Sequence, residues 1–173
     1  MKKRRGKAGL LNIYYYLAVV LSFNILVFAA PVLSVLGDPL SQDIHLFLSP
    51  FCHQLFERSM CMSSAFEIGN CDLDSGFVHR FPVCSRDMSF YLTMLLGGLA
   101  YVLLGKRDEK EIPSLMLLVG SMLPLAIDGI TQLLGIRESS NFLRILTGGI
   151  AGFAIPFFLI PIMNRLQRPE KKV

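Results

Sequence analysis

Four long apolar runs constrain the fold of this chain more than any other feature of its sequence. They cover residues 11–36, 88–105, 113–135 and 141–166 of 173, and 53% of all residues are hydrophobic. Each run approaches the roughly 20 residues that an α-helix needs to cross the hydrocarbon core of a bilayer. The sequence therefore predicts an all-α, polytopic membrane protein, with residues 1–173 forming a single membrane domain of four transmembrane helices.

Basic residues are distributed unevenly around these runs and predict the topology. Twelve of them gather before the first run, between the second and third, and after the last: Lys2, Lys3, Arg4, Arg5, Lys7, Lys106, Arg107, Lys110, Arg165, Arg168, Lys171 and Lys172. Cytoplasmic loops carry such an excess of lysine and arginine. We therefore expect a multi-pass protein of the cell membrane with both termini in the cytoplasm and residues 37–87 outside. Since topology accounts for the basic excess, the expected partner is the lipid bilayer, and nucleic acid is not expected.

The outer segment, residues 37–87, is predicted to contain one short interfacial helix. Ser49-Pro50 is typical of an N-cap followed by the first helical residue. The helix is expected to run from residue 50 to about residue 60, with Phe51, Leu55 and Phe56 facing lipid or core. Residues 61–81 are polar and rich in turn-forming residues, so we expect a loop there.

Two ionisable residues interrupt the last two apolar runs. Asp128 and Arg144 each lie among aliphatic neighbours, and charges at membrane depth indicate a functional site because they cost a few kcal/mol each on insertion scales. The link at 136–140 is short, so the two helices should be antiparallel neighbours. The polar residues thereby brought to the outer end are Asp128, Gln132, Arg137, Glu138, Asn141 and Arg144. They predict an outward-facing polar pocket; the alternative is a buried ion pair that only holds two helices together.

A second polar cluster lies in the outer segment and carries metal-ligand chemistry. Cys52, His53, Cys84 and Asp87 offer the thiolate, imidazole and carboxylate donors that zinc accepts, so zinc or another divalent metal is a candidate cofactor. The alternative is a pair of disulfides, because all four cysteines lie in this segment and an even number is typical of an oxidising compartment. The nested pairing would join Cys61 to Cys71 and Cys52 to Cys84. For Cys52 and Cys84 a disulfide, a metal site and free thiols all stay open.

Three motifs in this order resemble a known family. The runs CHQLFERS at 52–59, PVCSRD at 82–87 and IDGITQLLGIRESSNFLRILTG at 127–148 are similar to those of the uncharacterised membrane family catalogued as domain of unknown function 2085. The resemblance covers residues from about 50 to the end of the last run and implies a small polytopic membrane protein without an assigned activity. Many members carry a second cysteine where this chain has Asp87, so a purely thiol-based function is not favoured here.

Three classes of function compete. The first is a membrane enzyme or binding protein with an outward-facing polar site for an amphiphilic or anionic ligand, because arginines would meet a lipid-facing wall. Its candidate catalytic residues are Asp128, His53, Arg144 and Arg86, and its candidate ligand-binding residues are Gln54, Arg58, Gln132, Arg137, Glu138 and Asn141. A thiol-disulfide oxidoreductase of the membrane and a small transporter component are the alternatives. The absence of a CxxC motif argues against the oxidoreductase, and the absence of an inverted repeat argues against the transporter.

Overall fold

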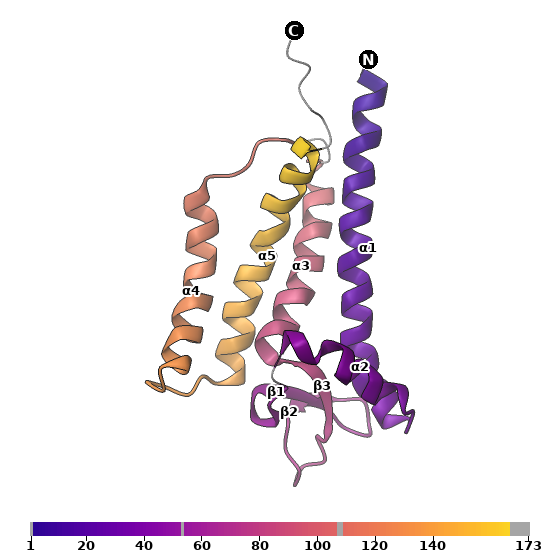
Figure 1. The fold of residues 1–173 in the computed structure, drawn as a ribbon, viewed down its shortest axis with the longest axis vertical. Helices are drawn as coiled ribbons and strands as arrows, with labels where there is room; N and C mark the ends of the chain where they lie inside the picture. Colours follow the sequence, from indigo (N-terminus) through magenta and orange to yellow (C-terminus); the bar gives the residue numbers. More distant parts are fainter. Residues whose placement is uncertain (1, 53, 107–108, 167–173) are drawn as a thin grey trace.

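Long helices lie side by side, and a small sheet closes one end of the bundle (Figure 1). The computed structural model describes residues 2–52, 54–106 and 109–166, with side chains from residue 10 onward. The long helices are α1 (Lys2–Val35), α3 (Ser85–Leu103), α4 (Leu115–Leu133) and α5 (Asn141–Leu166). The beginning of α1 and the end of α5 both lie at the end of the bundle opposite the sheet. Which end faces the cytoplasm stays a prediction.

Three helices of the described chain are long and apolar enough to cross a membrane. They are the Leu10–Val35 part of α1, and all of α4 and α5. The second predicted span, residues 88–105, is confirmed as a helix, α3, but α3 is not among these three. Its first turn carries Arg86 and Asp87, which lower its mean hydropathy. That α3 also crosses the membrane stays a prediction.

The predicted all-α class is wrong for the outer segment, which contains a three-stranded antiparallel sheet. Its strands are β1 (Ser59–Met62), β2 (Ile68–Asn70) and β3 (His79–Cys84), in the order β2-β1-β3. Phe81 and Val83 of β3 are fully buried in a core shared with α1. This burial explains why a stretch that reads as a polar loop is ordered: its few apolar side chains pack against the helix.

The predicted interfacial helix at 50–60 is also wrong, because the helix lies earlier in the chain. It is α2 (Leu40–Leu48), whose Ile44 and Leu48 are buried in the same core as Phe81. Ser49-Pro50 ends α2 and starts only a short 3-10 turn, since proline has no N–H with which to continue the α-helical hydrogen-bond ladder. Two 3-10 turns follow, Ser49–Phe51 and Phe56–Arg58, and they lead directly into β1.

Glycines bring α3 and α5 into close contact. A Cβ atom placed on Gly148 would overlap the backbone carbonyl of Arg86, and one on Gly152 would overlap that of Phe90. Small residues at helix interfaces let backbones approach in this way. The contact fixes the position of the first turns of α3, including Arg86, against α5.

We expect Gly152→Ala to lower the free energy of unfolding by roughly 1–3 kcal/mol, because the added methyl group must displace the α3 backbone. The matched control is Gly120→Ala in α4, where an added Cβ meets no atom within 4 Å. There alanine should stabilise the helix by up to about 1 kcal/mol. Thermal unfolding of both variants in one detergent measures the difference, and equal stability would contradict the close contact.

Candidate functional site

Asp128 of α4 is the buried centre of an arginine cluster. Its side chain is 2% exposed. Oδ2 accepts a short hydrogen bond from Nη2 of Arg86 on α3, and Oδ1 accepts one of 3.0 Å from Nη2 of Arg137. The same Nη2 of Arg86 donates to Oε1 of Gln132, one turn after Asp128, at 3.2 Å. Both oxygens of this carboxylate are therefore engaged by guanidinium groups, and Asp128 orients Arg86.

Arg144 of α5 is a buried cation with little compensation. The residue is 3% exposed. Its Nη1 donates to Oδ1 of Asn141 at 2.9 Å, and its nearest carboxylate among the described residues is Glu138, at 3.9 Å. Because the Glu138 side chain is 80% exposed, water screens much of this attraction. The buried-ion-pair alternative does not describe Arg144, since Asp128 pairs with two other arginines.

Cys52, Cys84 and Asp87 converge at the junction of β3 and α3. The backbone N–H of Cys84 donates to Sγ of Cys52 at 3.1 Å, and the Cys84 thiol donates to Oδ2 of Asp87 at 3.2 Å. One donor atom from each residue lies within 4.8 Å of the other two. Three of the four predicted metal ligands are thus brought together, whereas His53 lies outside the described residues.

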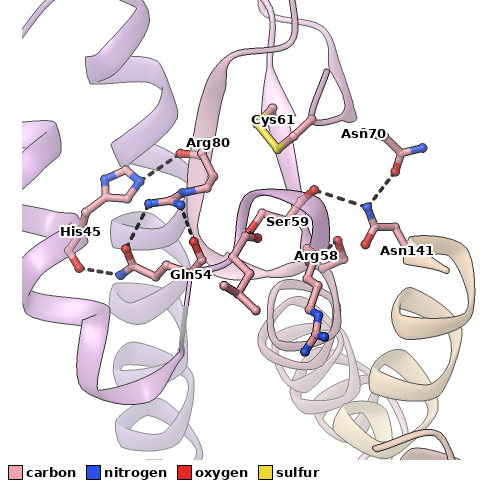
Figure 2. The surroundings of a disulfide bond; sticks show 11 residues. His45, Gln54, Arg58, Ser59, Cys61, Asn70, Arg80 and Asn141 are labelled. Atoms are coloured by element: carbon pink, nitrogen blue, oxygen red, sulfur yellow. Dashed lines mark hydrogen bonds between the residues drawn. A yellow bond between two sulfur atoms is a disulfide. The ribbon is translucent and has the colours of Figure 1, made fainter. Parts of the chain in front are cut away.

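Gln54 is held in place by hydrogen bonds with Arg80 and His45, which we call the polar clasp. Figure 2 shows Arg80 beside the side chains of His45 and Gln54. Arg80 donates to the backbone carbonyl of Gln54, whose Nε2 donates to the carbonyl of His45 at 2.6 Å. These bonds hold Gln54 in a left-handed conformation, φ 50°, that non-glycine residues adopt infrequently. The clasp fixes the turn that places Cys52 and Gln54 at the helix ends.

The sheet is joined to α5 by Asn141. Its Nδ2 donates to Oδ1 of Asn70 at 3.0 Å and to the carbonyl of Ser59 at 3.4 Å (Figure 2). β1 pairs Ser59 with Cys84 of β3. Arg58, which precedes Ser59, therefore lies close to both the cysteine cluster and α5.

These clusters surround one cavity of about 210 Å³, which we call the arginine pocket. It is lined by Phe51, Cys52, Gln54, Leu55, Arg58, Cys84, Arg86, Asp87, Gln132 and Arg144. Three arginines face one carboxylate, so the lining is net positive. Nε of Arg86 and Nε2 of Gln132 are buried donors without a hydrogen-bond partner in the described part of the chain. The pocket therefore presents positive charge, which suits an anion, and two of its lining residues each have a buried donor without a partner.

A second hollow of about 370 Å³, the α4–α5 groove, has Asp128 in its lining. It is lined by Gly120, Leu123, Pro124, Ile127, Asp128, Arg137, Leu143 and Thr147. The α4 members recur every three or four residues, so the groove follows one helix face for about 12 Å at 1.5 Å per residue. Most of this lining is apolar, and the Asp128–Arg137 pair is its charged part.

The structure divides the predicted site residues into three groups. One group lines the arginine pocket together with Cys52, Cys84 and Asp87; its members are Gln54, Arg58, Arg86, Gln132 and Arg144. Asp128 and Arg137 lie in the groove beside it, and Asn141 supports Arg144. Glu138 is exposed beside Arg58 and Arg144.

Two apolar pocket residues, Phe51 and Leu55, were expected to face lipid or core, so their contribution to the site was missed. The sequence feature that could have identified them is their position next to predicted site residues, since Phe51 precedes Cys52 and Leu55 follows Gln54.

The cysteines take one of the two predicted bridges. Cys61 and Cys71 form a disulfide between β1 and the residue that follows β2. Cys52 and Cys84 are free thiols, so the second bridge of the nested pairing is not formed in this structure. Both sulfurs instead take part in the hydrogen bonds that involve the Cys84 N–H and Asp87.

Hydrogen bonding shifts the pKa values of the two thiols in opposite directions. A hydrogen bond from the Cys84 thiol, aided by backbone N–H groups of Gln54 and Cys84, lowers the pKa of Cys52 to about 7. The same hydrogen bond, burial and the Asp87 charge raise the pKa of Cys84. Cys52 is therefore the more acidic thiol of the pair.

Comparisons with known proteins match part of the site: the family match includes Cys84, Asp128 and Arg144 but not Cys52 or Arg58. A family model described as "predicted membrane protein (DUF2085)" matches residues 73–158. An uncharacterized protein of Methanocaldococcus jannaschii is 36% identical over 157 residues, covering 86% of this chain and 92% of the relative. An uncharacterized protein of Methanothermobacter thermautotrophicus is 40% identical over 79 residues, covering 44% and 68% respectively. No solved structure matches the chain.

We expect Asp128→Asn to lower the free energy of unfolding by roughly 3–5 kcal/mol, because it removes the countercharge of Arg86 and Arg137 in a buried pair. Glu138→Gln is the matched control, since its exposed carboxylate should contribute less than about 1 kcal/mol. Unfolding in detergent measures both. Similar losses for the two variants would contradict the anchoring role of Asp128.

In chelator-treated protein, alkylation of Cys52 should accelerate as pH rises through about 7, since the thiolate is the nucleophile. Cys84 should react slowly over the same range. Because the folded pKa lies below that of an unfolded thiol, the stability contributed by the thiolate is fully present above the unfolded pKa and is lost as pH falls through about 7. Mass mapping of iodoacetamide adducts against pH measures the midpoint, and a midpoint near that of a free thiol would contradict the lowered pKa of Cys52. The charged side chains that line the pocket with Cys52 are Asp87, Arg58, Arg86 and Arg144.

Proposed function

Because the chain belongs to the DUF2085 family of predicted membrane proteins, which sit in a lipid bilayer, we propose that its arginine pocket binds the anionic headgroup of a membrane amphiphile. The observation that carries this proposal is Arg144. It is a buried guanidinium inside a cavity, and most of its five N–H donors make no hydrogen bond in the described structure. The nearest carboxylate among the described residues, Glu138, lies 3.9 Å away and is exposed, so a bound anion would give this buried charge a closer partner.

The other donors favour the same kind of ligand. Arg58 and Arg86 line the cavity with Arg144, and the unpartnered Nε of Arg86 lies in the same wall as the unpartnered Nε2 of Gln132. Guanidinium groups bind phosphate and carboxylate oxygens through paired N–H donors, with both charge and geometry contributing. A phosphate-bearing headgroup fits this set, because it presents several acceptor oxygens at once.

Apolar surfaces next to the pocket support an amphiphile over a free anion. Phe51 and Leu55 line the pocket itself. The α4–α5 groove lies within helices that are apolar enough to cross a membrane, and its apolar wall begins at the Asp128–Arg137 pair. An acyl chain in this groove would leave its headgroup near the arginine cluster. The pocket residues then have separate roles, with Arg58, Arg86, Gln132 and Arg144 binding the headgroup and Asp128 holding Arg86 in place.

Arg144→Gln should weaken binding of an anionic phospholipid by roughly 10-fold or more, since a hydrogen bond to a charged group contributes about 1.5–3 kcal/mol. Arg165→Gln is the matched control, because this exposed arginine lies at the other end of α5. Native mass spectrometry of the purified protein in detergent measures bound phosphatidylglycerol and, for comparison, phosphatidylcholine.

Inorganic phosphate distinguishes the two sources of the anion. We expect phosphate to compete only weakly with phosphatidylglycerol, because it lacks the chain. Equal binding by phosphatidylcholine, or an equal loss in both arginine variants, would contradict the proposal. Strong competition by phosphate would indicate a pocket for a free anion instead of a lipid.

A further inference from the structure

We propose that Cys52, Cys84 and Asp87 form a binding site for a zinc-class divalent ion in the wall of the arginine pocket. This inference goes beyond the binding of an anionic amphiphile and does not depend on it. It uses only three side chains that the structure places together.

The donor atoms are already close to the arrangement that zinc requires. Two sulfurs bound to one tetrahedral zinc at about 2.3 Å lie about 3.8 Å apart, and a sulfur and an oxygen lie about 3.5 Å apart. In the structure Sγ of Cys84 lies 3.2 Å from Oδ2 of Asp87, and all three donor atoms fall within 4.8 Å of one another. Shifts of about 1 Å or less, which side-chain rotation can supply, would complete this geometry.

Three different segments bring the ligands together without the ion. Cys84 ends β3, where it pairs with Ser59 of β1, and Asp87 follows in the first turn of α3. Cys52 comes from the turn fixed by the Gln54–Arg80 clasp, and the Cys84 N–H holds its sulfur. A site formed before the ion arrives binds it with little ordering cost.

The chemistry of the donors selects the class of ion. Two thiolates favour zinc over magnesium or calcium, which prefer oxygen ligands. The ion would replace the thiol protons, including the one that now bridges Cys84 and Asp87. Three protein ligands leave one tetrahedral position for water or an anion, as in zinc sites that bind exogenous ligands. All three ligands also line the arginine pocket, so that position is next to Arg58, Arg86 and Arg144.

Zinc binding by the full chain in detergent, without added lipid, tests the site. Chelator-treated protein dialysed against zinc should retain about one ion per chain, the number expected for one tetrahedral site. Cys52→Ser and Asp87→Asn should lower the zinc affinity by roughly 10–100-fold or more. Asp72→Asn is the matched control, because Asp72 is a carboxylate in the sheet region that lies outside the cluster. Equal zinc content in the wild-type chain and Cys52→Ser would overturn the proposal.

A second measurement needs no variant and so does not depend on variant folding. Zinc should slow alkylation of Cys52 and Cys84 in the wild-type chain, whereas magnesium should not. Unchanged alkylation in the presence of zinc would overturn the site, as would a Cys52–Cys84 disulfide in protein isolated without reductant. Because no lipid is present, failure here leaves the headgroup test unaffected, and failure of the headgroup test leaves this one unaffected.

Discussion

A single buried carboxylate connects the helices around the pocket. Asp128 of α4 accepts hydrogen bonds from Arg86 of α3 and from Arg137 in the link to α5. α4 is largely exposed along its length and packs mainly against α5, so this cluster is its polar connection to α3. Charges buried in apolar helices need partners of opposite charge, and here Arg86 and Arg137 both pair with Asp128. The excess positive charge is what the pocket presents to a ligand.

The second constraint is the glycine contact between α3 and α5. Gly148 and Gly152 allow the two backbones to approach closely enough that Arg86 lies against α5. From there its guanidinium extends to Asp128 on α4, while Arg144 of α5 lines the same cavity. The sheet is attached to the start of α5, because Asn141 donates hydrogen bonds to Ser59 of β1 and to Asn70.

Sequence patterns predicted the parts of this site that depend on local periodicity. Asp128 and Gln132 share a helix face because they are four residues apart, and both contact Arg86. The Cys61–Cys71 bridge and the family were also predicted correctly. The partner of Asp128 could not be predicted, because it depends on the rotation of α3 against α5, which no spacing within either helix determines. The sheet was missed because its strands are short and β3 is buried at three consecutive residues, Phe81, Pro82 and Val83, instead of alternating.

The sequence allowed more than one interpretation of Cys52 and Cys84. From sequence, two cysteines on either side of a loop suit a disulfide as well as a metal. Asp87 was included in the predicted ligand set because it lies three residues after Cys84, and in the structure it accepts a hydrogen bond from the Cys84 thiol. Asp87 thereby supplies a carboxylate donor beside the two thiols.

The order of residues in the Asp128 cluster has a consequence for biosynthesis. Arg86 precedes Asp128 by one helix in the chain, so α3 is synthesised before α4. An unpaired aspartate at the centre of a helix costs about 2.5–3.5 kcal/mol on insertion scales. Arg86, the cation that offsets this cost, has already been synthesised when α4 emerges from the ribosome, whereas α5, whose glycines position Arg86, follows later. Arg137 arrives nine residues after Asp128. Arg144 comes last, so the cavity acquires its least compensated charge only when the final helix is inserted.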